Sequence, residues 1–360
     1  MIPKKPVRIQ TDAAVDFLRD KYGIKKDNRH WFILYIDDKS GFFARILKSI
    51  FGLFSVREGF SVDSRCWPDH LVVAKSEAKS TVLLDYKEGA AWKVISVGLG
   101  LSKKEKDFNI LRYNQEVFAL QKMADSGLRM SPPLLSFFSP QAHQSYACLA
   151  TELRVDLERA SFDQWHERLE VIGENLIRWY SFNGIRRESL SETLEVLEQE
   201  LRERSFQKSL RQSCLMMIER GAFLAESITD DSVILSSFVH GDVAPRNALV
   251  SREEIYLIDW GDSRWAPLVY DLLTMELNIV ANRRSSDLRW SPWCASNDQK
   301  LSAMAAGVGD KYRSLFDCFG FDEKVLHVNL LVAVLERTLR RHDEGEDVYR
   351  SKKMKAFFFT

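Results

Sequence analysis

Two short segments contain side chains whose types and spacing suit phosphate chemistry. The first, "HGDVAPRN" at residues 240–247, follows an apolar pair and contains Asp242 and Asn247. In "LIDWGD", residues 257–262, Asp259 also follows an apolar stretch. An enzyme that moves a phosphoryl group needs metal ligands, a positioned cation and a carboxylate that orients the attacking hydroxyl, because the transferred oxygens are negatively charged. These three side chains are candidates for the carboxylate and the metal ligands.

The two segments resemble the signature of the aminoglycoside phosphotransferase and choline kinase families. That signature is His-Gly-Asp, four residues, Asn, and then an apolar-apolar-Asp of the Asp-Phe-Gly type. The resemblance is specific over 238–275 and weaker, but in the correct order, from about 70 to 250. The loop is closer to the form seen in phosphotransferase-like proteins associated with bacterial polysaccharide synthesis. The resemblance implies a protein-kinase-like fold with ATP and Mg²⁺ as cofactors.

The resemblance also implies a role for each residue of the two segments. Asp242 would accept or orient the proton of the acceptor hydroxyl, and Asn247 and Asp259 would bind Mg²⁺ on the ATP phosphates. His240 would orient the loop, and Asp271 resembles the family's buried carboxylate that anchors the loop backbone.

The segment from 70 to 97 predicts the sheet that must hold the nucleotide. Its three apolar runs, "HLVVAK", "TVLLDY" and "AAWKVISV", are separated by short polar turns, which indicates an antiparallel meander. A capping box of Ser102 and Glu105 then opens a helix that Gly127 ends, and a further strand follows at 145–151. This order predicts a small α+β lobe.

The same resemblance assigns nucleotide contacts in this lobe. Lys93, on the third strand, would hold the α and β phosphates, and Glu116 on the following helix would pair with it. Glu105 is the weaker candidate for that partner because it already serves the capping box. The exposed backbone of Glu152 and Leu153, after the fourth strand, would meet adenine.

Two features leave alternatives open. The turn "KSEAKS" at 75–80 has no Gly, although a phosphate-covering loop usually needs one so that its backbone can approach the phosphates. Side-chain donors of Ser76 and Ser80, together with Lys79, could replace it. Arg246 in the loop either reaches the transferred phosphate or contacts a neighbouring carboxylate.

Beyond residue 153 the apolar spacing becomes mostly helical. Helices are predicted at 161–180, 189–204, 206–227, 267–281, 299–318 and 323–342, with a short strand at 255–260. The predicted fold class is α+β and bilobal, with a small antiparallel-sheet lobe that carries one helix and a larger, mostly helical lobe. The predicted domains are an extension at 1–60, a nucleotide-binding lobe at 61–152, and a helical lobe with the catalytic loop and acceptor site at 153–360.

Within the extension, residues 41–56 have their apolar side chains on one helical stripe. The first interpretation is an amphipathic helix docked on the main body. The second is a basic amphipathic helix that lies on a membrane surface.

Composition narrows the classes of partner. The chain has 360 residues with 51 Lys plus Arg and 51 Asp plus Glu, so its formal net charge is zero. The overall charge therefore does not attract nucleic acid or anionic lipid. The five Cys are scattered without metal-ligand spacing, which is typical of reduced thiols in the cytosol and makes a zinc site improbable. The N-terminus lacks the apolar core of a signal peptide, and no apolar run reaches transmembrane length. These observations predict a cytoplasmic enzyme.

The acceptor should bind near 261–300, by the same resemblance. Six side chains of this region could stack on sugar rings or bind anions: Trp265, Trp290, Trp293, Arg283, Arg284 and Arg289. It has few carboxylates to match a polycationic antibiotic, which favours a sugar-like small molecule or glycan. The alternatives are a catalytically silent kinase-like binding module, which the Gly-free turn favours, and an antibiotic or protein kinase.

Overall fold

The structure is a computed structural model in which the described residues are 7–9, 12–24, 26–35, 55–62, 70–76, 80–98, 101–139, 144–204, 208–228, 230, 232–282, 319 and 322–343. The chain divides into two compact units, each described separately below. Unit 1 comprises the segments 1–124 and 132–155, and unit 2 comprises 125–131 and 156–360.

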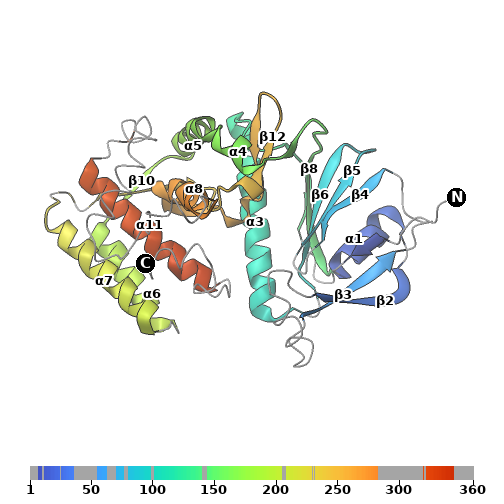
Figure 1. Ribbon diagram of the computed structural model, residues 1–360, viewed down its shortest axis with the longest axis horizontal. Helices are drawn as coiled ribbons and strands as arrows, with labels where there is room; N and C mark the ends of the chain where they lie inside the picture. Colours follow the sequence, from blue (N-terminus) through green and yellow to red (C-terminus); the bar gives the residue numbers. More distant parts are fainter. Residues whose placement is uncertain are drawn as a thin grey trace. The chain divides into compact units, whose positions relative to one another are not determined.

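Unit 1 is built on a five-stranded antiparallel sheet of order β4-β5-β6-β8-β7 (Figure 1). Its strands are β4 (Leu71–Ser76), β5 (Ser80–Asp85), β6 (Ala90–Ser96), β7 (Leu134–Phe138) and β8 (Tyr146–Glu152). The predicted meander and the predicted fourth strand, β8, are confirmed. β7 was not predicted, because it is an edge strand whose apolar side chains are mostly exposed and therefore do not alternate with polar ones.

Two helices cover opposite faces of this sheet (Figure 1). They are α1 (Asp12–Tyr22) and α3 (Lys103–Ser126). Adjacent residues of a strand point to opposite faces, so Trp92 and Lys93 of β6 face different helices. Trp92 packs on Phe17 of α1 with ring centroids 5.3 Å apart, whereas Lys93 reaches Glu116 of α3. α1 lies within residues 1–60, which were predicted to be an extension of the nucleotide-binding lobe. Its apolar side chains are part of the core of unit 1.

A second antiparallel sheet precedes this one, with the strand order β1-β3-β2. Its strands are β1 (Val7–Ile9), β2 (Lys26–Tyr35) and β3 (Ser55–Val62). The amphipathic helix predicted at 41–56 falls outside the described residues except for its last two positions, which begin β3.

Unit 2 is mostly helical, as predicted. Its helices are α4 (Phe162–His166), α5 (Leu169–Asn183), α6 (Leu190–Glu203), α7 (Lys208–Ala225), α8 (Val269–Asn282) and α11 (Glu323–Asp343). In Figure 1, α6, α7 and α11 lie side by side. The helix predicted at 299–318 falls outside the described residues. Together the two units confirm the predicted α+β class, with an antiparallel sheet in one part and a mostly helical second part.

The single helix predicted over 161–180 is two helices. The Ser161–Gln164 capping box opens α4 as expected, but α4 ends at His166 and α5 begins at Leu169. Arg168, between them, has φ −108° and ψ 15°, and its guanidinium donates to the carbonyl oxygens of Ser251 (2.9 Å) and Arg252 (2.7 Å). This tertiary contact holds the break, and periodicity alone does not reveal it.

Two small sheets of unit 2 hold the predicted catalytic segments. One has the order β10-β11-β14 and the other β13-β12-β9. Their strands are β9 (Glu158–Arg159), β10 (Arg186–Glu188), β11 (Ile234–Val239), β12 (Ala248–Val250), β13 (Ile255–Leu257) and β14 (Arg264–Pro267). Among the helices that the structure describes, none is both long and apolar enough to span a bilayer.

Candidate active site

The predicted catalytic loop, 240–247, leaves the end of β11. Every residue of β11 is buried, and the strand pairs with β10 on one side and β14 on the other. The loop ends in a 3-10 turn at Pro245–Asn247 and continues directly into β12. Both ends of the loop are therefore fixed by sheet hydrogen bonds.

Asp271, at the start of α8, fixes the beginning of the loop. Its carboxylate is fully buried and accepts from the backbone N–H groups of His240 (2.8 Å) and Gly241 (2.8 Å). The Tyr180 hydroxyl also donates to it, at 2.9 Å. Burial and the nearby carboxylate raise the pKa of Tyr180, so the phenol stays protonated and remains a donor. Asp271 thus anchors the loop backbone, as the sequence resemblance implies.

His240 is completely buried and its two ring nitrogens have different partners. Nδ1 lies 3.2 Å from the backbone N–H of Asp242, and Nε2 lies 3.2 Å from the carbonyl oxygen of Ile258. An N–H can only donate and a carbonyl can only accept, so these contacts require the neutral tautomer with hydrogen on Nε2. The ring also packs on Trp260, with centroids 4.4 Å apart. His240 therefore joins the loop to the Asp259 segment.

Gly241 has no substitute at its position. Its φ is +86°, and a Cβ there would lie 2.3 Å from the carbonyl oxygen of Asp262. Only glycine allows both this backbone conformation and this close approach.

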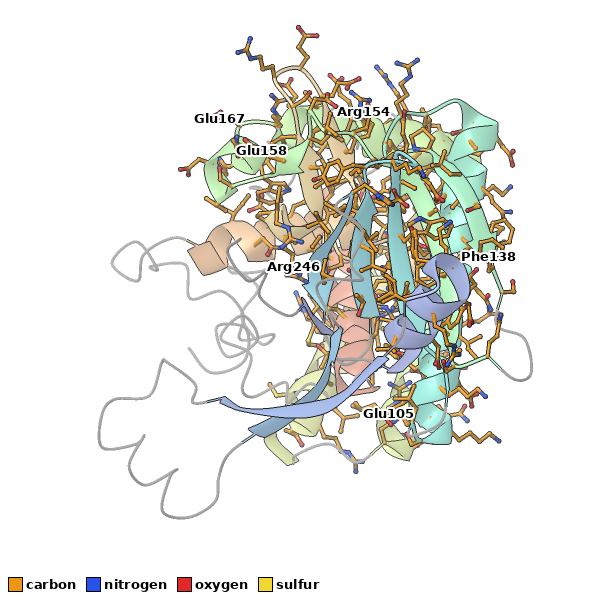
Figure 2. All side chains as sticks on the ribbon, turned by 90° about the vertical axis from the view of Figure 1, so that its right-hand side faces the viewer. Glu105, Phe138, Arg154, Glu158, Glu167 and Arg246 are labelled. Atoms are coloured by element: carbon orange, nitrogen blue, oxygen red, sulfur yellow. The ribbon has the colours of Figure 1, made fainter. Side chains whose placement is uncertain are left out.

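Asp242 is held by two donors that come from the end of its own loop. Its Oδ2 accepts from Arg246 Nη2 (2.6 Å) and from Asn247 Nδ2 (2.8 Å). The Asn247 amide also donates to the Asp242 carbonyl oxygen, at 2.9 Å. Of the two interpretations of Arg246, the structure therefore shows the contact with a carboxylate. The Arg246 side chain is half exposed (Figure 2), whereas the Asp242 side chain is 9% exposed.

The hairpin of β12 and β13 brings the two predicted metal ligands together. Ala248 pairs with Leu257, and the Ile258 N–H donates to the Asn247 carbonyl oxygen at 2.8 Å. Asn247 and Asp259 therefore lie at the same end of the hairpin, although twelve positions separate them in the sequence.

Asp259 has a left-handed backbone, with φ 63° and ψ 58°. It is the only non-glycine residue with a positive φ among those that the structure describes. Asp tolerates this conformation better than most residues, yet it still costs about 1 kcal/mol or more. Such strain is concentrated at functional sites, where it places a side chain that a relaxed backbone would point elsewhere.

The ligand set suits Mg²⁺. This ion prefers oxygen ligands and is usually held by one or two protein groups together with substrate phosphates and water. The Asn247 amide nitrogen is turned toward Asp242, so its oxygen is the atom available to a cation. The carboxylate of Asp259 is partly exposed and would be the second oxygen ligand of such an ion.

In unit 1, Lys93 and Glu116 form an ion pair. Lys93 Nζ lies 2.6 Å from Glu116 Oε2, and the Glu116 side chain is 6% exposed. Glu105, at one end of α3 (Figure 2), instead accepts from the backbone N–H (2.9 Å) and the hydroxyl (2.7 Å) of Ser102. Glu116 is therefore the partner of Lys93, and Glu105 is the helix cap.

The other predicted nucleotide contacts in unit 1 are the β4–β5 turn and the backbone that follows β8. Ser76 and Ser80 lie at the facing ends of β4 and β5, and the turn between them, including Lys79, falls outside the described residues. The N–H groups of Glu152 and Leu153 donate to the carbonyl oxygens of Pro133 and Gly89, each at 2.8 Å. These two N–H groups are therefore used within unit 1, and the contact of this backbone with adenine stays a prediction.

The predicted acceptor residues are described only in part. The Arg186 guanidinium lies over the Trp265 ring, 3.5 Å from its centroid. Asp262 accepts from Arg340 of α11 at 2.7 Å, a contact that the sequence did not suggest. The remaining predicted acceptor residues fall outside the described part of the chain: Arg283, Arg284, Arg289, Trp290 and Trp293.

A change at the loop anchor tests the role of Asp271. In Asp271→Asn, the side chain has one acceptor oxygen instead of two, and its amide would face a backbone N–H. We expect the free energy of unfolding to fall by about 2–4 kcal/mol, measured by urea denaturation. Glu195→Gln, on the exposed side of α6, is the control and should leave it unchanged. Equal stability of the Asp271→Asn variant and the wild type would contradict the anchoring role.

Comparison with known proteins gives one family match. Residues 115–288 match the model of the phosphotransferase enzyme family (APH). No curated protein sequence matches the chain. Three solved structures illustrate what it is similar to. For choline kinase LicA from Streptococcus pneumoniae, identity is 14% over 88% of this chain and 97% of that chain, with a TM-score of 0.46.

The other two are an aminoglycoside phosphotransferase and a glucosamine kinase by their printed names. For aminoglycoside phosphotransferase APH(4)-Ia with ADP and hygromycin B, identity is 12% over 80% of this chain and 92% of that chain, with a TM-score of 0.47. For glucosamine kinase with glucosamine, ADP and inorganic phosphate, identity is 12% over 80% of each chain, with a TM-score of 0.44.

Proposed function

Because residues 115–288 of this chain match the model of the phosphotransferase enzyme family, we propose that the protein transfers the γ-phosphate of ATP to a hydroxyl group of a small molecule or glycan. The observation that carries this proposal is the arrangement around the loop. Asn247 holds the Asp242 carboxylate with its amide nitrogen and meets the Asp259 segment through its backbone. These hydrogen bonds support the proposal that Asp242 is the general base and that Asn247 and Asp259 are the oxygen ligands of the metal ion.

The proposed cofactor is Mg-ATP. The ammonium group of Lys93, oriented by Glu116, would hold the α and β phosphates. Asn247 Oδ1 and the Asp259 carboxylate would hold Mg²⁺, which when bound neutralises charge on the phosphate oxygens. Ser76 and Ser80 would donate to the phosphates in place of a glycine-rich backbone. Adenine would meet carbonyl oxygens, rather than N–H groups, of Glu152 and Leu153.

Asp242 would orient the acceptor. Arg246 and Asn247 hold its Oδ2, which leaves Oδ1 to receive the hydroxyl hydrogen bond. The hydroxyl oxygen forms a bond to the γ-phosphorus as the bond to ADP breaks, and its proton passes to Asp242 or to the phosphate product. His240, whose neutral ring is fully engaged, positions the loop and takes no part in proton transfer.

The proposed acceptor is sugar-like. Its class rests on the sequence of residues 261–300, which contains Trp265, Trp290 and Trp293 and has few carboxylates. Two of these carboxylates, Asp262 and Asp271, already have protein partners. The test is an ATP-consumption screen over sugars, amino alcohols, nucleosides and lipid-linked glycans, with mass detection of an added phosphate. ATP consumption that no compound in the panel raises above background would contradict the proposal.

A catalytically silent module is the second candidate function. The turn at 75–80, which has no Gly, favours this candidate. A glycine-rich backbone can approach phosphate groups more closely than side-chain donors can, so this turn would hold ATP less well. Such a module would bind a protein or small-molecule partner without using Mg-ATP.

Arg246 tests how the carboxylate is held. In Arg246→Gln we expect kcat to fall about tenfold while KM for ATP changes less than twofold, because the side chain contacts Asp242. Steady-state kinetics with varied ATP measures both constants. Arg252→Gln, an exposed position in the β12–β13 turn, is the control. A rise in KM for ATP with kcat unchanged would assign Arg246 to the phosphates instead.

A further inference from the structure

The Asp259 segment, residues 257–262, ends in a residue that α11 holds by an ion pair. Asp262 closes the 3-10 turn Trp260–Asp262, and its Oδ1 accepts from Arg340 Nη2 at 2.7 Å. The Asp262 side chain is 10% exposed and that of Arg340 is 20% exposed. Such a pair is costly to break, because the loss of one partner leaves a largely buried charge uncompensated.

The backbone of Asp262 is fixed as well. Its carbonyl oxygen accepts from Arg264 Nη1 at 3.3 Å. The same oxygen lies against Gly241 of the catalytic loop, so closely that a Cβ on Gly241 would be 2.3 Å from it. Asp262 is therefore the point at which the Asp259 segment contacts both the catalytic loop and, through Arg340, the helix α11.

Asp259 depends on support from both of its neighbours because its backbone is strained, with φ 63° and ψ 58°. On one side, the Ile258 N–H donates to the Asn247 carbonyl oxygen at 2.8 Å. On the other side, the Ser263 N–H donates to the Trp260 carbonyl oxygen at 3.0 Å. A 3-10 turn has poor hydrogen-bond geometry and is a weak restraint by itself, so the ion pair with α11 adds to the support on this side.

The same ion pair bears on a second role that the Asp262 carboxylate could have. Two aspartates three positions apart could both bind one cation, and Asp262 would then be a further ligand beside Asp259. A cation at Asp262 would have to compete with the Arg340 guanidinium, which already neutralises this carboxylate. The contact therefore favours an anchor over a metal ligand.

We propose that Arg340 is a positioning residue, which through Asp262 holds the Asp259 segment in the conformation that presents the Asp259 carboxylate to Mg²⁺. This inference rests on the proposed function, in which Asp259 binds the Mg²⁺ of the nucleotide. Arg340 itself would touch neither the nucleotide nor the acceptor. It acts from 78 positions away in the sequence, through its contact with Asp262.

The first measurement is hydrogen exchange of the full chain without nucleotide, followed by mass spectrometry of peptides that contain Ser263. In Arg340→Met we expect the amides of the Trp260–Asp262 turn and of Ser263 to exchange about tenfold faster than in the wild type. The amides of β12 should keep their wild-type rates. Arg340→Lys keeps the positive charge, so its exchange should lie between those of the wild type and Arg340→Met.

Arg204→Met is the matched control. Arg204 Nη2 lies 2.7 Å from Glu200 Oε2 of α6, and the Arg204 side chain is 24% exposed, so the two ion pairs are similar in length and in burial of the arginine. Arg204 also contacts α11, because its Nη1 donates to the Leu339 carbonyl oxygen at 2.9 Å. Arg204→Met should lower the melting temperature but leave the exchange at Ser263 unchanged.

The second measurement is the Mg²⁺ concentration at which ATP raises the melting temperature half-maximally. It should rise about three- to tenfold in Arg340→Met and in Asp262→Asn, and by no more than this in the double variant, because both changes remove the same contact. Lower stability alone would reduce the melting temperature with and without the ligand and would leave this Mg²⁺ concentration unchanged.

The proposal fails if exchange at Ser263 is the same in Arg340→Met and the wild type, or if Arg204→Met increases it equally. It also fails if Arg340→Met leaves the Mg²⁺ dependence unchanged, or if the effects of the two changes multiply in the double variant. An effect in Asp262→Asn alone would make Asp262 a metal ligand instead. If Arg340→Met does not fold, Arg340→Lys and Asp262→Asn allow the same comparisons.

Failure of the proposed function would be seen separately. A wild-type protein whose melting temperature does not respond to Mg-ATP would contradict that function. The exchange measurement needs no nucleotide, so it would still decide whether Arg340 holds the Asp259 segment.

Discussion

Replacing Asp242 with Asn is expected to reduce phosphoryl transfer by about 10³-fold or more and to leave the fold intact. The carboxamide has nearly the same size as the carboxylate and can still accept from the Asn247 amide, which lies 2.8 Å from Asp242 Oδ2. It cannot accept the proton of the acceptor hydroxyl. The change therefore removes the charge without altering the shape of the loop.

The measurement is the initial rate of phosphate addition to the acceptor that the screen identifies, with a thermal melt as the fold control. Arg246 loses its anionic partner in this variant, but its side chain is half exposed and water can solvate it. A folded Asp242→Asn protein with wild-type turnover would contradict the role of Asp242. A protein that no longer folds would not count as support, and Asp242→Ser would then be measured.

Replacing Asp259 with Asn should lower the rate by about 10²-fold or more at physiological Mg²⁺. Asn adopts the left-handed conformation as readily as Asp, so the backbone at φ 63° is preserved while one negative metal ligand becomes neutral. The loss should be partly recovered at high Mg²⁺ concentration, because the amide oxygen still binds the ion weakly.

Initial rates as a function of Mg²⁺ concentration measure this effect. Asp259→Ala is the matched variant, since it removes the ligand and also strains the backbone. It should have no recovery at high Mg²⁺ and a lower melting temperature. Identical Mg²⁺ dependence in the wild type and Asp259→Asn would remove Asp259 from the metal site.

The catalytic loop was predictable because its signal is local. Two short segments, joined by the β12–β13 hairpin, contain His240, Asp242, Asn247 and Asp259. The pairing register of the hairpin determines which residues of the two segments lie beside each other. The capping box at Ser102 also fixed where α3 begins, which places Glu116 on the face that meets Lys93.

Other features depend on contacts between distant segments, and the sequence had no signal for them. α1 packs on Trp92 through Phe17, from a stretch that lacked a clear role in the linear pattern. The N–H groups of Glu152 and Leu153 donate to the carbonyl oxygens of Pro133, just before β7, and Gly89, in the β5–β6 turn. The periodicity of apolar residues indicates which face of a helix or strand is buried, but it does not indicate which segment packs against that face.

The central claim is that the protein binds Mg-ATP through Lys93 and Asp259, and thermal melting with and without Mg-ATP tests it without knowledge of the acceptor. We predict that Mg-ATP raises the melting temperature of the wild type by several degrees, because a ligand that binds only the folded state stabilises it. The rise should disappear in Lys93→Met and Asp259→Asn and persist in Lys87→Met, an exposed position in the β5–β6 turn. A wild-type melting temperature that Mg-ATP leaves unchanged would contradict the claim and favour the silent module.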